Sequence, residues 1–172
     1  KTYEGTIELG ASTDSYDAQG AVISRADVPN LDCVELNAHA QEFLGDIQQK
    51  PPMVSAVKKN GIPLYKLARK GKIIDRDPKP VHIFSYEFSD YNVPVSKFCI
   101  HCSKGTYVRS LAHELGKKLG CGAHLRTLHR TKSGSFDIKD AIKLEELVVL
   151  PDLELHRRII SLVELTRSLQ SA

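Results

Sequence analysis

The residues best suited to chemistry lie in one stretch, from Cys102 to Leu111. An alternating strand pattern there runs through a Ser-Lys-Gly loop into a helical pattern that carries Tyr107 and Arg109. A tyrosine ring can stack on a nucleobase, and a guanidinium can bind a phosphate or a carboxylate in a bidentate manner. The loop from Ser103 to Thr106 adds backbone donors at a helix start, where an anion can bind, although most such turns bind only water. The stretch therefore favours a nucleic acid, and RNA in particular, as the partner.

Basic residues gather in two blocks. Residues 58–79 contain eight basic and two acidic residues, and residues 97–133 contain eight basic and one acidic residue, although the net charge of the whole chain is only +3. Alternation with acidic segments favours a polyanion-binding face, while solvated surface lysines remain an alternative for either block alone. The candidate RNA contacts in these blocks are Lys58, Lys59, Lys66, Arg69, Lys70, Lys72, Lys104, Arg126 and Arg130.

The composition is that of an ordinary cytosolic protein. With 172 residues, of which 41% are hydrophobic and 26% charged, the chain can form one full-sized core. It has no apolar run of the roughly 20 residues that a membrane span needs, and no signal-peptide pattern. The chain starts at Lys1, already inside a strand pattern, so we expect it to be a fragment of a longer protein.

Four cysteines raise the question of a zinc site. Cys99-x-x-Cys102 and Cys121-x-x-His124 have spacings found in zinc ribbons. The alternation over residues 95–102, however, predicts a strand that places Cys99 and Cys102 on opposite faces, so that a shared metal would require the strand to break. We expect reduced thiols and no metal.

The first half of the chain is expected to form short elements. Residues 2–9 alternate as a half-buried strand with Tyr3 on its apolar face. Residues 10–20 resemble a polar loop before a short strand at 21–23, and Asp14 and Asp17 in this loop could be an acid–base pair, cation ligands, or side chains that bond their own turn. Helical spacing predicts a helix over roughly 37–48, with Asn37 as its cap.

Residues 58–79 are expected to form a projecting basic arm. They begin with a turn signal at 58–61, continue with a short helix at 63–70 that ends before Gly71, and carry little apolar content.

The second half is expected to supply most of a sheet. Strands are predicted at 81–88 and 96–102, and Thr106 is expected to cap a helix that reaches about Leu119. Tyr107 and Arg109 would flank the buried stripe of this helix on opposite sides if both were helical, and would share a face if the chain were still extended there. Residues 124–131 resemble an edge strand along a charged groove, and helices are predicted at about 144–150 and 153–169. The fold class is α+β, with a mixed, largely antiparallel sheet and flanking helices.

Together these segments resemble the TruB family of tRNA pseudouridine synthases, from Lys1 to about Leu147. The motifs that carry the resemblance are Lys1–Tyr3 with Leu9–Gly10, Thr13–Gly20, Pro51–Lys58 with Gly61, Tyr65 and Ala68–Arg69, Cys102–Leu111, and Gly120–Leu125 with Leu128 and Arg130. Several motifs in the family's order are far more specific than any one of them.

The resemblance implies isomerisation of uridine 55 in the T arm of tRNA, on a base flipped out of its stack. It implies no cofactor, metal or membrane partner, and we expect a monomer. By motif match, Tyr3 is the stacking tyrosine, Arg109 the partner of the catalytic aspartate, Tyr107 a neighbour in the pocket and Leu128 a pocket wall. Without the match, Tyr3 and Leu128 would be core residues, and Arg109 would pair with Glu114 or another nearby acid.

The chain departs from the family pattern at two places. The catalytic aspartate lies in a Gly-Thr-Leu-Asp-Pro type motif upstream of the strand with Tyr3, and residues 1–172 contain no such motif. Val54 stands where the family usually has an aromatic residue. We therefore expect residues 1–172 to be the larger, C-terminal part of one catalytic domain, inactive by itself, with a thumb-like insertion at about 58–79. The alternative function is a tRNA-binding or tRNA-folding module without catalysis.

Overall fold

The computed structural model describes residues 1–170. Residues 2–129 form one compact unit, and Lys1 belongs with residues 130–170 to a second. None of the helices in this range combines the length and apolar composition that crossing a membrane requires.

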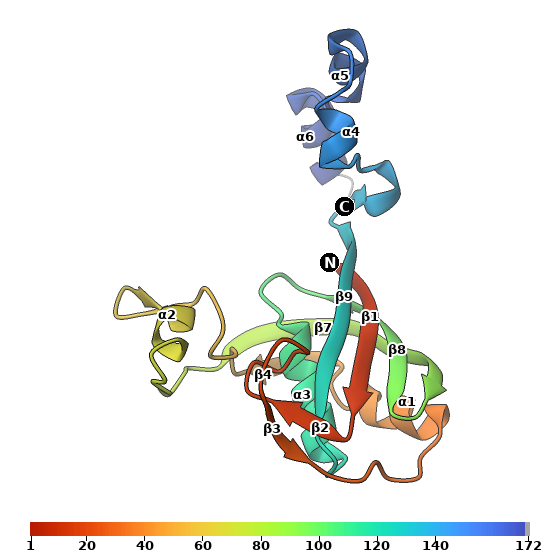
Figure 1. The fold of residues 1–172 in the computed structure, drawn as a ribbon. Coiled ribbons are helices and arrows are strands. Elements are labelled where there is room, and N and C mark those ends of the chain that lie inside the picture. Colours follow the sequence, from red (N-terminus) through yellow and green to blue (C-terminus); the bar gives the residue numbers. More distant parts are fainter. Residues whose placement is uncertain (171–172) are drawn as a thin grey trace. The chain divides into compact units, whose positions relative to one another are not determined.

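Six strands of the described residues form one sheet in the order β10-β9-β1-β8-β7-β4 (Figure 1). Their bounds are β1 (Thr2–Leu9), β4 (Gly45–Gln49), β7 (Lys79–Asn92), β8 (Val95–Cys102), β9 (Ala123–Ser133) and β10 (Phe136–Asp137). The pairs β1/β8, β7/β8, β4/β7 and β9/β10 are antiparallel. The predicted α+β class with a largely antiparallel sheet is confirmed.

The core lies between one face of this sheet and two helices, α1 (Cys33–Gln41) and α3 (Val108–Lys118). Alternation along β8 buries Phe98, Ile100 and Cys102 and leaves the residues between them exposed, as expected for a sheet with one covered face. From α3 the core receives the predicted apolar stripe, namely Val108, Leu111, Ala112, Leu115 and the adjoining Leu119.

The helix predicted over 37–48 is wrong in its bounds and in its cap, and only residues 37–41 of it are helical. The helix α1 starts earlier, because Asp32 caps it and forms a capping box with Glu35, and Asn37 lies inside it. The chain turns at Gly45, whose φ of +83° favours glycine, and continues as β4, in which Ile47 pairs with Val81 of β7.

Two further segments contain more strand than predicted. Residues 11–13, expected to lie in a loop, form β2 (Ala11–Thr13), which pairs with β3 (Val22–Arg25). At the start of the arm, β5 (Lys58–Lys59) and β6 (Ile62–Pro63) form a hairpin around the predicted turn, where Asn60 and Gly61 both have positive φ. The short helix follows as α2 (Leu64–Ala68), and in Figure 1 this arm lies to the side of the sheet.

The second unit contains three short helices and a 3₁₀ turn among its described residues. They are η1 (Ile138–Asp140), α4 (Leu144–Leu147), α5 (Asp152–Arg158) and α6 (Leu162–Gln170). The single helix predicted over 153–169 is therefore two helices, because the backbone becomes extended at Ile159.

Candidate active site

One cavity of about 450 Å³ brings together the four residues that the motifs single out. Its wall includes Tyr3, Tyr107, Arg109 and Leu128, together with Asp17. They come from four separate segments of residues 2–129, so the fold assembles a site that no local pattern in the sequence contains.

The apolar part of the wall comes from the sheet. Tyr3 lies on β1 and is half-buried, and it packs against the core while lining the cavity, so the two interpretations of this ring are compatible. Leu128 lies on β9 and is 44% exposed, which excludes the alternative that it is a core residue. An aromatic ring and an aliphatic side chain on neighbouring strands can together hold a flat base.

The charged part of the wall is an ion pair. The Nη1 of Arg109 donates to Oδ2 of Asp17 at 2.8 Å, and the two side chains are only 23% and 27% exposed. The Nη2 of Arg109 donates to the carbonyl oxygen of Val54 at 2.7 Å. The alternative for Arg109 was a salt bridge with Glu114 or another nearby acid. Glu114 is not the partner, since it approaches Lys117 at 4.0 Å, and the acid that pairs with Arg109 is Asp17.

Asp17 is itself held by its own loop. Its Oδ1 accepts the hydroxyl of Ser15 at 2.6 Å and the backbone N–H of Gln19 at 3.2 Å. Of the three alternatives left open for Asp17, bonding within its turn is therefore part of the answer, and the ion pair to Arg109 is the part that the sequence did not indicate. The two residues are 92 positions apart, so no periodicity could connect them.

The loop before α3 decides how Tyr107 and Arg109 share the cavity. Thr106 is not the helix cap as predicted, because its hydroxyl donates to the carbonyl of Ser103 at 3.0 Å. Tyr107 is the N-cap residue and is extended, with φ −100° and ψ 99°. Gly105 makes the preceding turn with φ +87°. Since Tyr107 is extended and Arg109 lies in the first helical turn, both side chains reach the same cavity.

A buried glutamine holds this loop and was not predicted as a site residue. The side-chain amide of Gln49, at the end of β4, forms two hydrogen bonds with the backbone of Tyr107. The sequence gives only a weak signal for it, which is a glutamine two residues before Pro51-Pro52.

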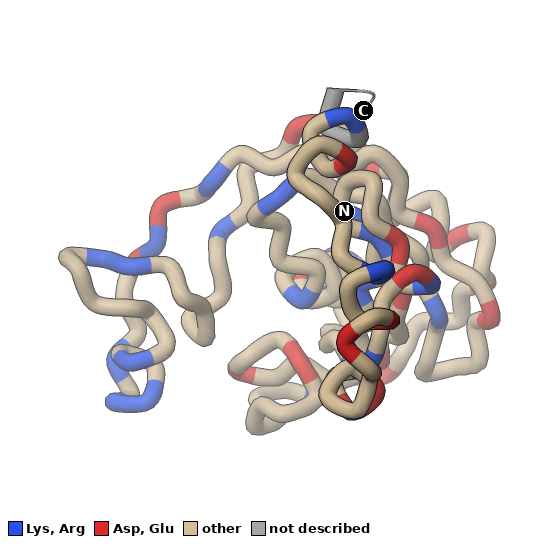
Figure 2. The backbone as a smooth tube through the Cα atoms, turned by 90° about the horizontal axis from the view of Figure 1, so that it is seen from above, with Lys and Arg blue, Asp and Glu red and all other residues tan. Residues whose placement is uncertain are grey.

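The predicted RNA-contacting cations lie mostly on the surface. Lys58, Lys66, Arg69, Lys70 and Lys72 are exposed on the arm, and Figure 2 shows basic residues along this segment. The other four lie in different places. Lys59 donates to the carbonyl of Asp75 at 2.7 Å, and Lys104 is exposed in the loop before α3. Arg126 lines the cavity, and its Nη1 lies 3.5 Å from Oε2 of Glu8. Arg130 belongs to the second unit.

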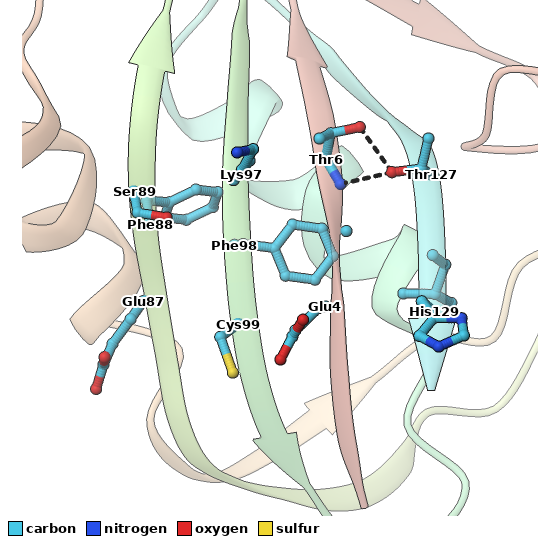
Figure 3. Close-up of a pocket in the computed structure, with 12 residues that line it drawn as sticks. Glu4, Thr6, Glu87, Phe88, Ser89, Lys97, Phe98, Cys99, Thr127 and His129 are labelled. Carbon is cyan, nitrogen blue, oxygen red and sulfur yellow. Dashed lines mark hydrogen bonds between the residues drawn. The ribbon is translucent and has the colours of Figure 1, made fainter. Parts of the chain in front are cut away.

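A second cavity, of about 500 Å³, lies over the strands β7, β8, β1 and β9 (Figure 3). Glu4, Glu87, Lys97 and Cys99 line it and are exposed. Although Cys99 is exposed overall, partial desolvation of its sulfur raises the pKa of the thiol, and the carboxylates of Glu4 and Glu87 raise it further. Since a raised pKa leaves little thiolate at neutral pH, Cys99 is not an activated nucleophile.

The cysteines do not converge on a common point. The strand β8 runs unbroken through Cys99, which is exposed, and Cys102, which is buried. Cys121 is also buried, and the Nδ1 of His124 lies 3.1 Å from the carbonyl oxygen of Ala11.

Comparisons with known proteins point to one family. Residues 1–108 match the TruB family pseudouridylate synthase N-terminal domain, and residues 109–162 match the tRNA pseudouridylate synthase B C-terminal domain. The chain is 46% identical over 169 residues to tRNA pseudouridine synthase B of Opitutus terrae, covering 98% of this chain and 70% of that protein. It is 47% identical over 163 residues to the protein of the same name from Francisella philomiragia, covering 94% of this chain and 53% of the relative.

A solved structure shares the fold as well. One chain of a crystal structure of a Cbf5-Nop10-Gar1 complex superposes with a TM-score of 0.60 at 29% identity, covering 86% of this chain and 35% of that one. The chain spans little more than half the length of several relatives named tRNA pseudouridine synthase B. The chain belongs to the TruB family of pseudouridylate synthases.

Proposed function

We propose that the full-length protein containing this chain isomerises uridine to pseudouridine at position 55 in the T loop of tRNA. The observation that carries the proposal is the cavity in which Tyr3, Leu128 and the Arg109–Asp17 pair meet. The named relatives support the same reaction class.

The geometry suits a base that has left its stack. The ring of Tyr3 offers an aromatic face, and Leu128 offers an apolar wall beside it. A guanidinium has five N–H donors, and two of those on Arg109 donate to Asp17 and Val54. Arg109 can therefore also bind the carboxylate of the family's catalytic aspartate, keep it ionised and fix its position.

Residues 1–172 are proposed to be inactive alone, since that aspartate is not among them. The test incubates the 172-residue chain and the full-length protein with a T-arm RNA and quantifies pseudouridine by mass spectrometry. We expect product only from the full-length protein. Turnover by the chain alone would contradict the assignment of the nucleophile, and RNA binding without turnover by the full-length protein would favour the non-catalytic module.

The arm at 58–79 is proposed to act as a thumb that holds the phosphates of the T loop. Changing Lys66, Lys70 and Lys72 to Gln should weaken RNA binding and lower the slope of log K against log salt by about 2 to 3, since each phosphate contact contributes about 0.7 to 0.9. The control changes three lysines that already pair with acidic side chains, Lys97, Lys117 and Lys118. Equal slopes for the two triple variants would show that the arm is ordinary surface. We also propose that the protein acts in the cytoplasm, because none of its four cysteines, all of which the structure describes, forms a disulfide.

A further inference from the structure

We propose that Gln49 is a positioning residue of the active site, whose side-chain amide fixes the backbone of Tyr107 and thereby sets where Tyr107 and Arg109 lie in the cavity. The inference rests on the proposed function, because it assigns a role in the same reaction.

The contact is a two-point hydrogen bond between a side chain and a backbone. The Oε1 of Gln49 accepts the N–H of Tyr107 at 2.7 Å, and the Nε2 of Gln49 donates to the carbonyl of Tyr107 at 3.1 Å. The orientation of the amide follows from its partners, because the flipped amide would face donor to donor and acceptor to acceptor. Two bonds to one residue fix both the distance and the rotation of the backbone there, as a strand partner would.

Tyr107 needs such a partner at this point of the fold. It is extended and precedes the first turn of α3, and no side chain of the loop caps the helix. Gln49 is only 7% exposed, so water does not compete freely for these groups. The amide of Gln49 therefore determines the direction in which the chain enters α3, and Arg109 follows two residues later.

The segment after Gln49 reaches the same site a second time. Pro51 and Pro52 are fully buried. Their rings fix φ, which restricts the backbone between Gln49 and Val54. The carbonyl of Val54 then accepts the Nη2 of Arg109 at 2.7 Å. The segment 49–54 thus forms hydrogen bonds with Tyr107 at one end and with Arg109 at the other. These directional contacts indicate a positioning role, since a residue that only fills space makes no such bonds.

The first test uses Gln49→Met in the full-length protein, because methionine keeps the length of the side chain and forms neither hydrogen bond. We expect kcat to fall by about 10- to 100-fold, since misplacing a site by about 1 Å costs up to about 100-fold, with KM for T-arm RNA changed less than threefold. The matched control is Gln48→Met, the same substitution at the exposed neighbouring position, which should leave kcat unchanged.

The second test separates positioning from folding through Gln49→Glu. A protonated carboxyl can both donate to and accept from Tyr107, whereas the carboxylate can only accept and repels the carbonyl oxygen. Burial raises the pKa of such a carboxyl above its usual value of about 4.3. The kcat of the Glu variant divided by that of the wild type, at equal pH, should therefore rise as the pH falls from 8 to 5, while the same ratio for the Met variant stays flat.

Hydrogen exchange of the 172-residue chain provides a readout independent of activity. The amide of Tyr107 should exchange at least about tenfold faster in Gln49→Met than in the wild type or in Gln48→Met. If the wild-type full-length protein forms no pseudouridine, the proposed function fails, and this exchange measurement alone decides about Gln49. Unchanged exchange at Tyr107 overturns the proposal, as does a Met variant that is less stable but has an unchanged kcat.

Discussion

Replacing Asp17 by Asn tests whether the ion pair with Arg109 is a structural tie of the cavity. Asn retains an oxygen for the Ser15 hydroxyl and the Gln19 N–H, so the substitution removes mainly the charge that Arg109 binds. An exposed pair contributes about 0 to 1 kcal/mol, and breaking a fully buried one costs about 3 to 5 kcal/mol. With side chains 23% and 27% exposed, this pair lies between the two limits, and we expect a loss of about 2 kcal/mol.

The assay is urea unfolding of the single variants Asp17→Asn and Arg109→Met and of the double variant. In the Arg109→Met background, Asp17→Asn should cost less than about 0.5 kcal/mol, which gives a coupling free energy of about 1 to 2 kcal/mol. The control is Asp90→Asn, which breaks an exposed pair with Lys97 whose side chains are 63% and 64% exposed and should cost less than about 0.5 kcal/mol. Additive effects of the two single variants would refute the reasoning.

Three further predictions concern stability. Tyr86→Phe should stabilise the chain by about 1 kcal/mol in urea unfolding, because the Tyr86 hydroxyl is buried and has no partner among the described residues; a loss of stability would contradict this. Gly5→Ala should cost about 3 kcal/mol or more in the same assay, since its Cβ would lie 2.1 Å from the carbonyl oxygen of Thr127, and a near-neutral effect would show that the strands can separate there. Burial lowers the pKa of His113 from 6.5, so the unfolded chain binds more protons, and the free energy of unfolding should fall as the pH drops below about 6.5. His113→Gln should remove this part of the pH dependence. Equal slopes of unfolding free energy against pH for the variant and the wild type would refute it.

The strongest periodic patterns predicted their elements correctly. Residues 2–9 and 96–102 alternate with the period of a strand, and the apolar residues of α3 repeat with the period of a helix. Each element buries one face, and the two periods are easily told apart. The prediction over 37–48 failed because Phe43, Leu44 and Ile47 fit a helical spacing although Gly45 starts a strand, and the pairing of β4 with β7 outweighs the local pattern.

The site was predictable in its residue types and unpredictable in its connections. The motifs indicated Tyr3, Tyr107, Arg109 and Leu128, and the cavity contains all four. Whether Tyr107 and Arg109 share a face depends on where the helix starts, and the sequence favoured Thr106 as the cap whereas Tyr107 is the N-cap in the structure. The bonds of Arg109 to Asp17 and of Gln49 to Tyr107 join positions 92 and 58 residues apart, and only the folded chain brings them together.

The hydrogen bond from Arg109 to Val54 links the cavity to the start of the arm. Val54 lies four residues before the arm begins at Lys58, so the root of the arm and the cation of the cavity share one contact. A ligand that moves the arm far enough to displace Val54 also changes the free energy of holding Arg109, and by linkage a base that displaces Arg109 changes the free energy of moving the arm by the same amount. Under the proposed function, binding of RNA by the arm and occupation of the cavity by a base would then be thermodynamically coupled.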